Sequence, residues 1–454
     1  ANLYYGKDVS ELNVAECASI VSITQNPTKY NPFTNYDNLV ERTQTCLYLM
    51  HEQGYLSDEE YEEASNYQLV IAEDTGGQVN TYTDWSWFTE QVISDVLEDL
   101  KAEKSYTEEE AYDLLYNSGL RVYTTCDVEM QDYLEKAFNV DTNSTIFPAV
   151  INEEYPEGAF VVLGLDGQIK AIAGSDRTKT GARTFNRARD AVRHPGSTIK
   201  PIGAYALGVE YGLVNWSTML NNSPLYQKQD MVIRDEDYCR KNGLMGLSDS
   251  QLKAYPNAWR SWPRNYGGNY GDNSDVPLWN GLARSLNTIA VRVGDLVGAS
   301  NIFNFVYNTL QLNTLDPVND VGLAQMVMGS QTHGVTPTAL AAAFQIFYDG
   351  QYTTPHLYTR VLDRDGNIYL ENNSTSYQAL TPDTAYVMNR LLKNVLYSSV
   401  GTAGGRYPNS NGMEAFGKTG TASDEKDLWF VGGTPYYVTA VWWGYDAPYD
   451  MTNT

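Results

Sequence analysis

Ser197 and Lys200 form the first pair of residues whose types and spacing could support nucleophilic catalysis. They lie in the segment RHPGSTIKPIGAY, where Pro195-Gly196 interrupts regular structure and the apolar residues that follow have helical spacing. We therefore expect Ser197 at or beside a helix N-cap, with Pro201 in the first turn and Lys200 on the same helix face. Burial and the helix N-terminus would both lower the pKa of Lys200 towards that of a general base. A serine hydroxyl becomes a good nucleophile when such a base takes its proton.

Two later segments supply further polar groups for the same chemistry. Ser285 and Asn287 lie in GLARSLNTIAVRVGD, beside an apolar stripe of Leu282, Leu286, Ile289, Ala290 and Val293. Lys418 begins the run Lys418-Thr419-Gly420-Thr421, where Gly417 and Gly420 would let a backbone or a substrate approach a strand closely. Each motif alone occurs often by chance, and Ser-x-x-Lys alone equally predicts a capped helix with a surface lysine. Together and in this order they are the S-x-x-K, S-x-N and K-T-G set of β-lactamases and penicillin-binding proteins.

Other catalytic classes have weaker support. His194 is close to Ser197, but no G-x-S-x-G elbow is present. The remaining histidines are more simply structural or on the surface, and His51-Glu52 lacks the second histidine of a zinc protease. Four scattered cysteines, Cys17, Cys46, Cys126 and Cys239, show no ligand spacing and leave one or two disulfides open. We expect neither a metal nor a cofactor.

Composition excludes one class of partner. The 454 residues have 42% hydrophobic and 12% aromatic content, which indicates a folded chain of roughly two to four domains. With 31 basic and 56 acidic residues the net charge is −25, so we expect no nucleic-acid binding, which requires a basic footprint. No apolar run of 18 residues and no signal peptide is present. We expect the chain to be cut at both ends from a longer, membrane-anchored parent.

The elements that would position the motifs form a mixed pattern. The first seventy residues predict helices, one with a capped start at Ser10, one over Leu39–Gln53 and one opening at Ser57. A helix over Phe88–Ala102, a strand over Leu120–Thr125 and a helix over Glu129–Phe138 follow. Strands are expected over 159–163, 168–173, 415–421, 428–431 and 436–443, and helices over 198–210, 297–310, 322–328, 336–348 and 382–397. Strands at both ends of a helical middle predict one sheet made of distant segments, in the α+β class.

Beyond the three motifs, the chain resembles the bifunctional (class A) penicillin-binding proteins along nearly its whole length. AFVVLGLDGQIKAIAGS, FNRARDAVRHPGSTIKPI, HGVTPTALAAAFQIFYDG and LWFVGGTPYYVTAVWWGYD resemble the family's transpeptidase domain. GLRVYTTCDVEMQ resembles the entry to that domain, and the first seventy residues resemble the end of its glycosyltransferase domain. The resemblance implies a helical remnant of a lysozyme-like glycosyltransferase domain over 1–72, a small linker region over 73–148 and a transpeptidase domain over 149–454. That last domain would have a central, mainly antiparallel sheet flanked by helices.

The resemblance also implies a role for each motif residue. Ser197 would attack the penultimate D-Ala carbonyl of a D-Ala-D-Ala stem peptide, with Lys200 as base and Ser285 passing a proton to the leaving amine. Asn287 would hydrogen-bond Lys200 and substrate amides. Lys418, Thr419 and Thr421 would hold the substrate carboxylate on the Lys-Thr-Gly strand that includes Gly420, and the N–H groups of Ser197 and Thr421 would form the oxyanion hole. An amine from a neighbouring strand would resolve the acyl-enzyme, and β-lactam antibiotics would acylate the same serine.

The resemblance also implies a cellular location for the parent protein, and it leaves other functions open. The parent protein would work on the extracytoplasmic face of the bacterial membrane with the cell-wall synthesis and division machinery. Because upstream glycosyltransferase segments are missing, we expect no glycan polymerisation. Two features depart from the family pattern, namely the long stretch Gln227–Ala258 and the cysteine at position 126. A D,D-carboxypeptidase, a β-lactam-hydrolysing or β-lactam-sensing acyl-serine protein, and a non-catalytic peptidoglycan-binding scaffold are the alternatives.

Overall fold

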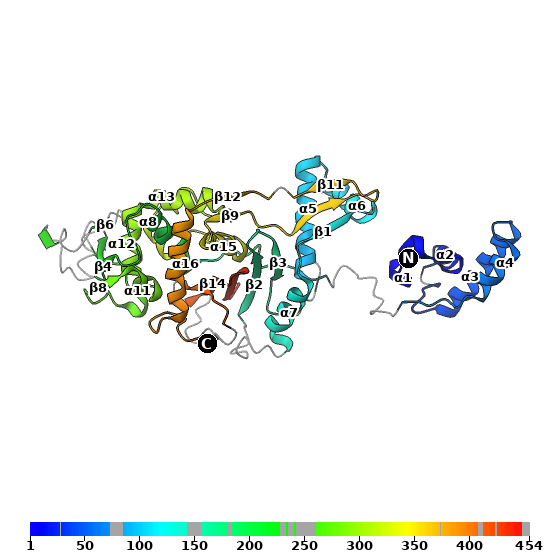
Figure 1. Ribbon diagram of the computed structural model, residues 1–454, viewed down its shortest axis with the longest axis horizontal. Coiled ribbons are helices and arrows are strands. Elements are labelled where there is room, and N and C mark those ends of the chain that lie inside the picture. Colours follow the sequence, from blue (N-terminus) through cyan, green and yellow to red (C-terminus); the bar gives the residue numbers. More distant parts are fainter. Residues whose placement is uncertain are drawn as a thin grey trace. The chain divides into compact units, whose positions relative to one another are not determined.

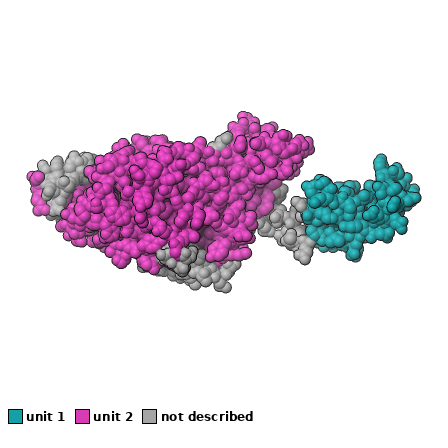
Figure 2. Space-filling view, in the orientation of Figure 1, with its two compact units in different colours: residues 1–83 teal, residues 84–454 magenta. Residues whose placement is uncertain are grey.

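The computed structural model divides the chain into two compact units, residues 1–83 and 84–454 (Figure 2). It describes all residues except 28, 73–84, 143–155, 180, 182–183, 228–232, 235–239, 242–259, 373, 407–411, 423–424 and 447–454. Each unit has its own hydrophobic core.

The first unit is helical, and its helix starts follow local capping chemistry. It consists of α1 (Asn2–Tyr5), a 3-10 turn (Val9–Glu11), α2 (Val14–Ile23), α3 (Tyr36–Glu52) and α4 (Asp58–Asn66). Ser57 caps α4 in a reciprocal capping box with Glu60, as the sequence predicts. The predicted start at Ser10 is wrong, because Asn13 and Glu16 form the capping box of α2 and Ser10 lies in the preceding 3-10 turn. Ala15, Ala18, Leu39 and Leu47 pack in the core of this unit.

The second unit begins with three helices, of which the first two pack on its main core and the third on the smaller core at the opposite face of the central sheet. These are α5 (Trp87–Lys104), α6 (Glu108–Asn117) and, after strand β1 (Arg121–Thr124), α7 (Val128–Phe138). Strand β1 pairs with β10 (Tyr358–Leu362), which pairs with β11 (Ile368–Glu371). The expected linker segment therefore shares a sheet with strands more than 200 residues away.

A five-stranded antiparallel sheet is the centre of this unit, in the order β13-β14-β15-β2-β3. It confirms the predicted α+β class, because β2 (Glu157–Gly164) and β3 (Ile169–Ala173) pair with strands from the other end of the sequence. Those strands are β13 (Phe416–Thr421), β14 (Asp427–Gly433) and β15 (Tyr437–Gly444). Burial alternates strictly along β15, so its two sets of side chains enter cores on opposite faces of the sheet. Strand β13 lies at one edge.

Helices cover both faces of the sheet (Figure 1). On one face, α15 (Pro337–Phe344) packs on β15, β2 and β14, and on the other α7 packs on β3 through Leu134 and Phe138. Helix α16 (Pro382–Tyr397) packs against β13 and against α11 (Leu278–Ala283). In the described part of this unit the other α-helices are α8 (Ala206–Glu210), α12 (Asn287–Val297), α13 (Ala299–Asn304) and α14 (Leu323–Met328), with 3-10 turns at 140–142, 196–198, 266–268 and 345–347.

Short strands complete the second unit. Strand β4 (Met219–Asn221) pairs with β8 (Asp275–Pro277), and β9 (Gln351–Thr353) pairs with β12 (Ser376–Gln378). Strand β5 (Leu225–Gln227) pairs with β6 (Ile233–Arg234) and β7 (Arg260–Trp262). Most of the long Gln227–Ala258 stretch lies outside the described residues.

Two helix predictions need correction. The helix expected over 198–210 is a 3-10 turn (Gly196–Thr198), a π-helical segment (Pro201–Tyr205) and α8 in succession. Pro201 has no N–H, and at the end of the segment the Ala206 N–H bonds to the Pro201 carbonyl five residues before it. The helix over 297–310 is likewise α13 followed by a π-helical segment (Phe305–Thr309). The helices expected over 322–328, 336–348 and 382–397 are confirmed by α14, by α15 with the 3-10 turn at 345–347, and by α16.

The described residues contain three cysteines and no single long apolar helix. Cys17, Cys46 and Cys126 are free thiols, and Cys239 lies outside the described residues. In the described ranges, no single helix has the length and apolar composition needed to cross a bilayer. One pair, 287–297 with 299–309, passes that test together but is bent by 89°.

Candidate active site

Three segments that are far apart in the sequence meet at the serine hydroxyl of Ser285. Lys418 Nζ, on β13, donates to Ser285 Oγ at 2.8 Å. Lys200 Nζ, from the turn before the π-helical segment, lies 3.3 Å from the same Oγ and 2.8 Å from the Ser285 carbonyl oxygen. The structure therefore brings the S-x-x-K, S-x-N and K-T-G motifs into one site, although 133 residues separate Ser285 from Lys418.

Ser197 lies in a 3-10 turn that is pressed against strand β13. The turn spans Gly196–Thr198, so Ser197 is inside the first turn, two residues after the N-cap Pro195. Gly196 has φ +51°, and a Cβ at this position would lie 2.3 Å from the Thr421 carbonyl oxygen and 3.0 Å from the Thr421 nitrogen. Only glycine allows this approach. The backbones of the Ser197 turn and of Thr421 are therefore adjacent, as an oxyanion hole between them requires.

Lys200 is fully buried, and its amine has two partners that can only accept hydrogen bonds. Nζ donates to the Ser285 carbonyl oxygen at 2.8 Å and to Asn287 Oδ1 at 2.5 Å. A neutral amine has two N–H groups and one lone pair, so these two acceptors match its donors and leave the lone pair for a hydroxyl. Among the hydrogen bonds of the described residues, none joins Lys200 to the Ser197 hydroxyl, which is half-buried.

Ser285 occupies a backbone position at which glycine is usual. Helix α11 ends in a Schellman motif, in which Leu286 N–H bonds to the Gly281 carbonyl and Ser285 N–H to the Leu282 carbonyl. The residue after the C-cap Arg284 must be left-handed, and Ser285 has φ +56°. A serine at this strained position directs its hydroxyl to both lysines. The five residues of the predicted apolar stripe over 282–293 are all buried in the core, and the Schellman turn divides them between α11 and α12.

Asn287 is the first residue of α12, and residues that the motif analysis missed hold it in place. Asn265 Oδ1 accepts the N–H of Asn287 at 2.7 Å and of Thr288 at 3.2 Å, so it caps α12 from a distant loop. Asn287 Nδ2 donates to the Arg264 carbonyl at 2.6 Å, which directs its Oδ1 towards Lys200. No local spacing predicts such a cap, because Asn265 is 22 residues before Asn287.

Strand β13 carries the third motif, Lys418-Thr419-Gly420, and contacts one further residue. Lys418 is fully buried and also donates to the Thr419 carbonyl at 2.8 Å. The Thr419 hydroxyl shares a hydrogen bond of 2.7 Å with the hydroxyl of Thr402, which the sequence did not single out. A Cβ on Gly420 would lie 2.6 Å from the Pro195 carbonyl oxygen, which confirms the expected close approach at this glycine.

Burial dominates the electrostatics of the two lysines. Desolvation lowers the pKa of Lys418 to about 7. Desolvation also lowers the pKa of Lys200 well below its ordinary value, and the nearby charge of Lys418 lowers it further. Both amines contact the Ser285 hydroxyl, and a positive charge on one lysine disfavours a positive charge on the other. The geometry therefore favours a neutral Lys200 beside a charged Lys418.

The segment that leads into Ser197 is fixed by the sheet. Trp429 Nε1, on β14, donates to the His194 carbonyl at 2.8 Å. The Arg193 guanidinium lies 4.9 Å from the ring of Trp442 and forms an ion pair with Asp446 at 3.1 Å.

Within the described ranges no cluster of three or more metal-ligand side chains occurs.

Two family models match the chain. A transglycosylase model matches residues 1–51, and a penicillin-binding protein transpeptidase model matches residues 244–445. The second match includes Ser285, Asn287 and the 418–421 strand, and the Ser197 turn precedes it.

Curated relatives cover nearly all of the chain. Penicillin-binding protein 1A of Clostridium acetobutylicum is 33% identical over 98% of this chain and 53% of its own length. Penicillin-binding protein 1A/1B of Bacillus subtilis is 29% identical over 96% of this chain and 43% of its own length. The chain thus spans about half the length of the curated relatives that it matches.

Solved structures share the fold. Penicillin-binding protein 1A from Haemophilus influenzae has a TM-score of 0.60 at 18% identity, over 99% of this chain and 78% of that one. The PonA1 protein from Mycobacterium tuberculosis, in complex with penicillin V, has a TM-score of 0.58 at 20% identity, over 80% of this chain and 86% of that one.

Proposed function

We propose that this chain, which belongs with the class A penicillin-binding proteins because part of a transglycosylase domain precedes its transpeptidase domain, is a peptidoglycan D,D-transpeptidase. The transpeptidase family is one of serine acyl-transferases. In our proposal Ser197 forms the acyl-enzyme with a stem peptide that ends in D-Ala-D-Ala. An amine of a neighbouring peptide then takes the acyl group and forms the cross-link.

The observation that carries the proposal is the Ser285 hydroxyl between two buried lysines. Lys200, held neutral by burial, takes the Ser197 proton as Oγ attacks the penultimate D-Ala carbonyl. When the bond to the terminal D-Ala breaks, the leaving nitrogen needs a proton. The Ser285 hydroxyl can deliver it and be reprotonated by Lys200. One proton thus passes from Ser197 to the released D-Ala, and the lysine returns to its neutral form.

Strand β13 supports the proposed binding of the donor peptide. It is an edge strand, so an extended peptide can add to it by main-chain hydrogen bonds. Charged Lys418, with the hydroxyls of Thr419 and Thr421, would hold the C-terminal carboxylate of the peptide. That carboxylate would also stabilise the ammonium of Lys418, whose pKa burial lowers to about 7 in the free protein.

The oxyanion of the tetrahedral intermediate would lie between the N–H groups of Ser197 and Thr421. The contact of Gly196 with the Thr421 backbone supports this pairing. Such fixed donors contribute roughly 3–4 kcal/mol each to the transition state. We also propose β-lactams as acylating ligands of Ser197, and the extracytoplasmic face of the bacterial membrane as the place of work.

The test of the proposed function is the fate of the acyl group. The chain is incubated with a donor peptide ending in D-Ala-D-Ala and with an acceptor amine, and D-Ala release and both products are measured by mass spectrometry. We expect D-Ala release and an amide-linked product that grows with acceptor concentration, with neither in Ser197→Ala. D-Ala release with only the hydrolysed acid would contradict transpeptidation and identify a D,D-carboxypeptidase. No release from the folded chain would contradict the catalytic proposal.

A further inference from the structure

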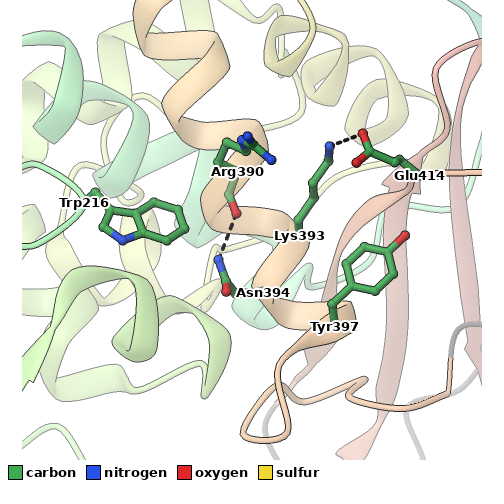
Figure 3. Close-up of a pocket in the computed structure, with 6 residues that line it drawn as sticks. All are labelled: Trp216, Arg390, Lys393, Asn394, Tyr397 and Glu414. Carbon is green, nitrogen blue, oxygen red and sulfur yellow. Dashed lines mark hydrogen bonds and ion pairs between the residues drawn. The ribbon is translucent and has the colours of Figure 1, made fainter.

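A hollow lies along α16, between that helix and two flanking segments of the chain (Figure 3). Its volume is about 630 Å³. Six residues line it, none of which belongs to the three motifs: Trp216, Arg390, Lys393, Asn394, Tyr397 and Glu414.

The floor of the hollow is one face of a single helix. Its four α16 residues are spaced i, i+3, i+4 and i+7 from Arg390 to Tyr397, which places them on one face. Trp216 comes from the loop after α8, and its indole points towards the helix from one side (Figure 3). Glu414, just before β13, faces Lys393 from the other side. Trp216 is 38% exposed and Tyr397 43%, so both aromatic residues are accessible to a ligand.

The polar groups of the hollow include donors and acceptors. Glu414 forms an ion pair of 2.6 Å with Lys393 and is 67% exposed at its side chain. The Lys393 ammonium lowers the pKa of Glu414, so this carboxylate is an ionised acceptor. The Arg390 guanidinium, which has five N–H donors, uses Nε for Tyr386. Asn394 donates to the Arg390 carbonyl at 2.9 Å.

These features favour one class of ligand. The hollow holds charges of both signs, and Lys393 is already paired with Glu414, so it is not built for an anion alone. A purely apolar ligand would desolvate three charged side chains. A sugar ring has an apolar C–H face that stacks on an indole, and its hydroxyl and acetamido groups both donate and accept hydrogen bonds. We propose that the hollow is a glycan subsite for the N-acetylated amino sugars of the cell-wall polymer. This inference rests on the proposed function, which supplies a glycopeptide substrate.

The hollow is linked to the strand that would bind the stem peptide. The Tyr397 hydroxyl accepts the N–H of Ala415, directly before β13. Lys418 follows three residues later, which is about 10 Å along an extended strand. Thr402, five residues after Tyr397, contacts Thr419. A glycan held on α16 would therefore raise the local concentration of its attached peptide at β13.

The test uses the full chain and a soluble β-1,4-linked tetramer of N-acetylglucosamine as the probe, with binding measured by saturation-transfer NMR on its acetamido methyl groups. We expect Trp216→Ala to weaken binding by about tenfold or more, because the indole on which the sugar face would stack is lost. Tyr436→Ala, which removes a 63% exposed ring outside the hollow, is the matched control and should bind as the wild type does.

Acylation by a fluorescent penicillin separates the two proposals, since penicillin has no glycan. Both variants should be acylated at the wild-type rate. Normal acylation with no tetramer binding by the wild type, or with equal binding by Trp216→Ala, overturns the glycan subsite alone. Failure of wild-type acylation overturns the proposed function, whatever the tetramer does.

Discussion

Replacing Lys200 by methionine should lower the second-order rate constant of acylation by penicillin by about 10²–10⁴-fold, which is the usual contribution of a general base. Methionine has nearly the same length and fills the buried space, but it cannot take the Ser197 proton. The rate constant is measured by time-resolved intact mass spectrometry.

Stability distinguishes this chemical effect from misfolding. The folded pKa of Lys200 lies far below the unfolded value, so at neutral pH the unfolded chain binds the proton more readily, and folding loses free energy. Methionine removes that cost, and the thermal midpoint of Lys200→Met should equal or exceed that of the wild type. A stable variant that is acylated within tenfold of the wild-type rate would exclude Lys200 as the base.

The same assignment predicts a bell-shaped pH profile of the acylation rate constant. Lys200 must be neutral, so the rate rises as the pH increases through its lowered pKa. Lys418 must be charged, so the rate falls as the pH increases beyond its pKa of about 7. Lys418→Arg should move the alkaline limb to higher pH and leave the acid limb in place, because arginine stays protonated. An unmoved alkaline limb would show that another group causes it.

Replacing Ser285 by glycine should separate catalysis from folding, with acylation at least about 10²-fold slower and stability almost unchanged. Glycine removes the left-handed strain of about 1–2 kcal/mol at this Schellman position. It also adds about 0.5–1 kcal/mol of entropic cost, so the two effects nearly cancel. The hydroxyl that both lysines contact is lost.

Ser105→Gly is the matched control for this prediction. Ser105 also ends a helix in the left-handed conformation, at φ +59°, but at the C-cap of α5 away from the catalytic residues. The two variants should have similar thermal midpoints, and only Ser285→Gly should lose acylation. If both variants were acylated at the wild-type rate, the Ser285 hydroxyl would have no part in the chemistry.

The parts of the fold that the sequence predicts are those that local interactions determine. The Asp166-Gly167 turn joins β2 to β3 where expected, and the α4 start is set by Ser57 and Glu60, which are neighbours in sequence. Pro201 shows the limit of such patterns. Apolar spacing indicates a helix after Ser197 but not the π-helical register that a missing N–H and the packing around it produce.

The candidate site also has residues that the sequence predicts and residues that it does not. The three motifs name the residues that converge, because their types are those that acyl transfer requires. Asn265 caps the start of α12 at Asn287, and Thr402 contacts Thr419, each from a loop without a distinctive local pattern. The left-handed conformation of Ser285 could not be predicted from the sequence either, because glycine, not serine, usually marks such a position.

The central claim, an acyl-serine site at Ser197, is tested most directly by the mass of the folded chain before and after incubation with a penicillin, followed by peptide mapping of the adduct. We predict one stoichiometric adduct, located on the peptide that contains Ser197, and none on Ser197→Ala. An adduct on another residue, or no adduct on a chain shown to be folded, would contradict the account.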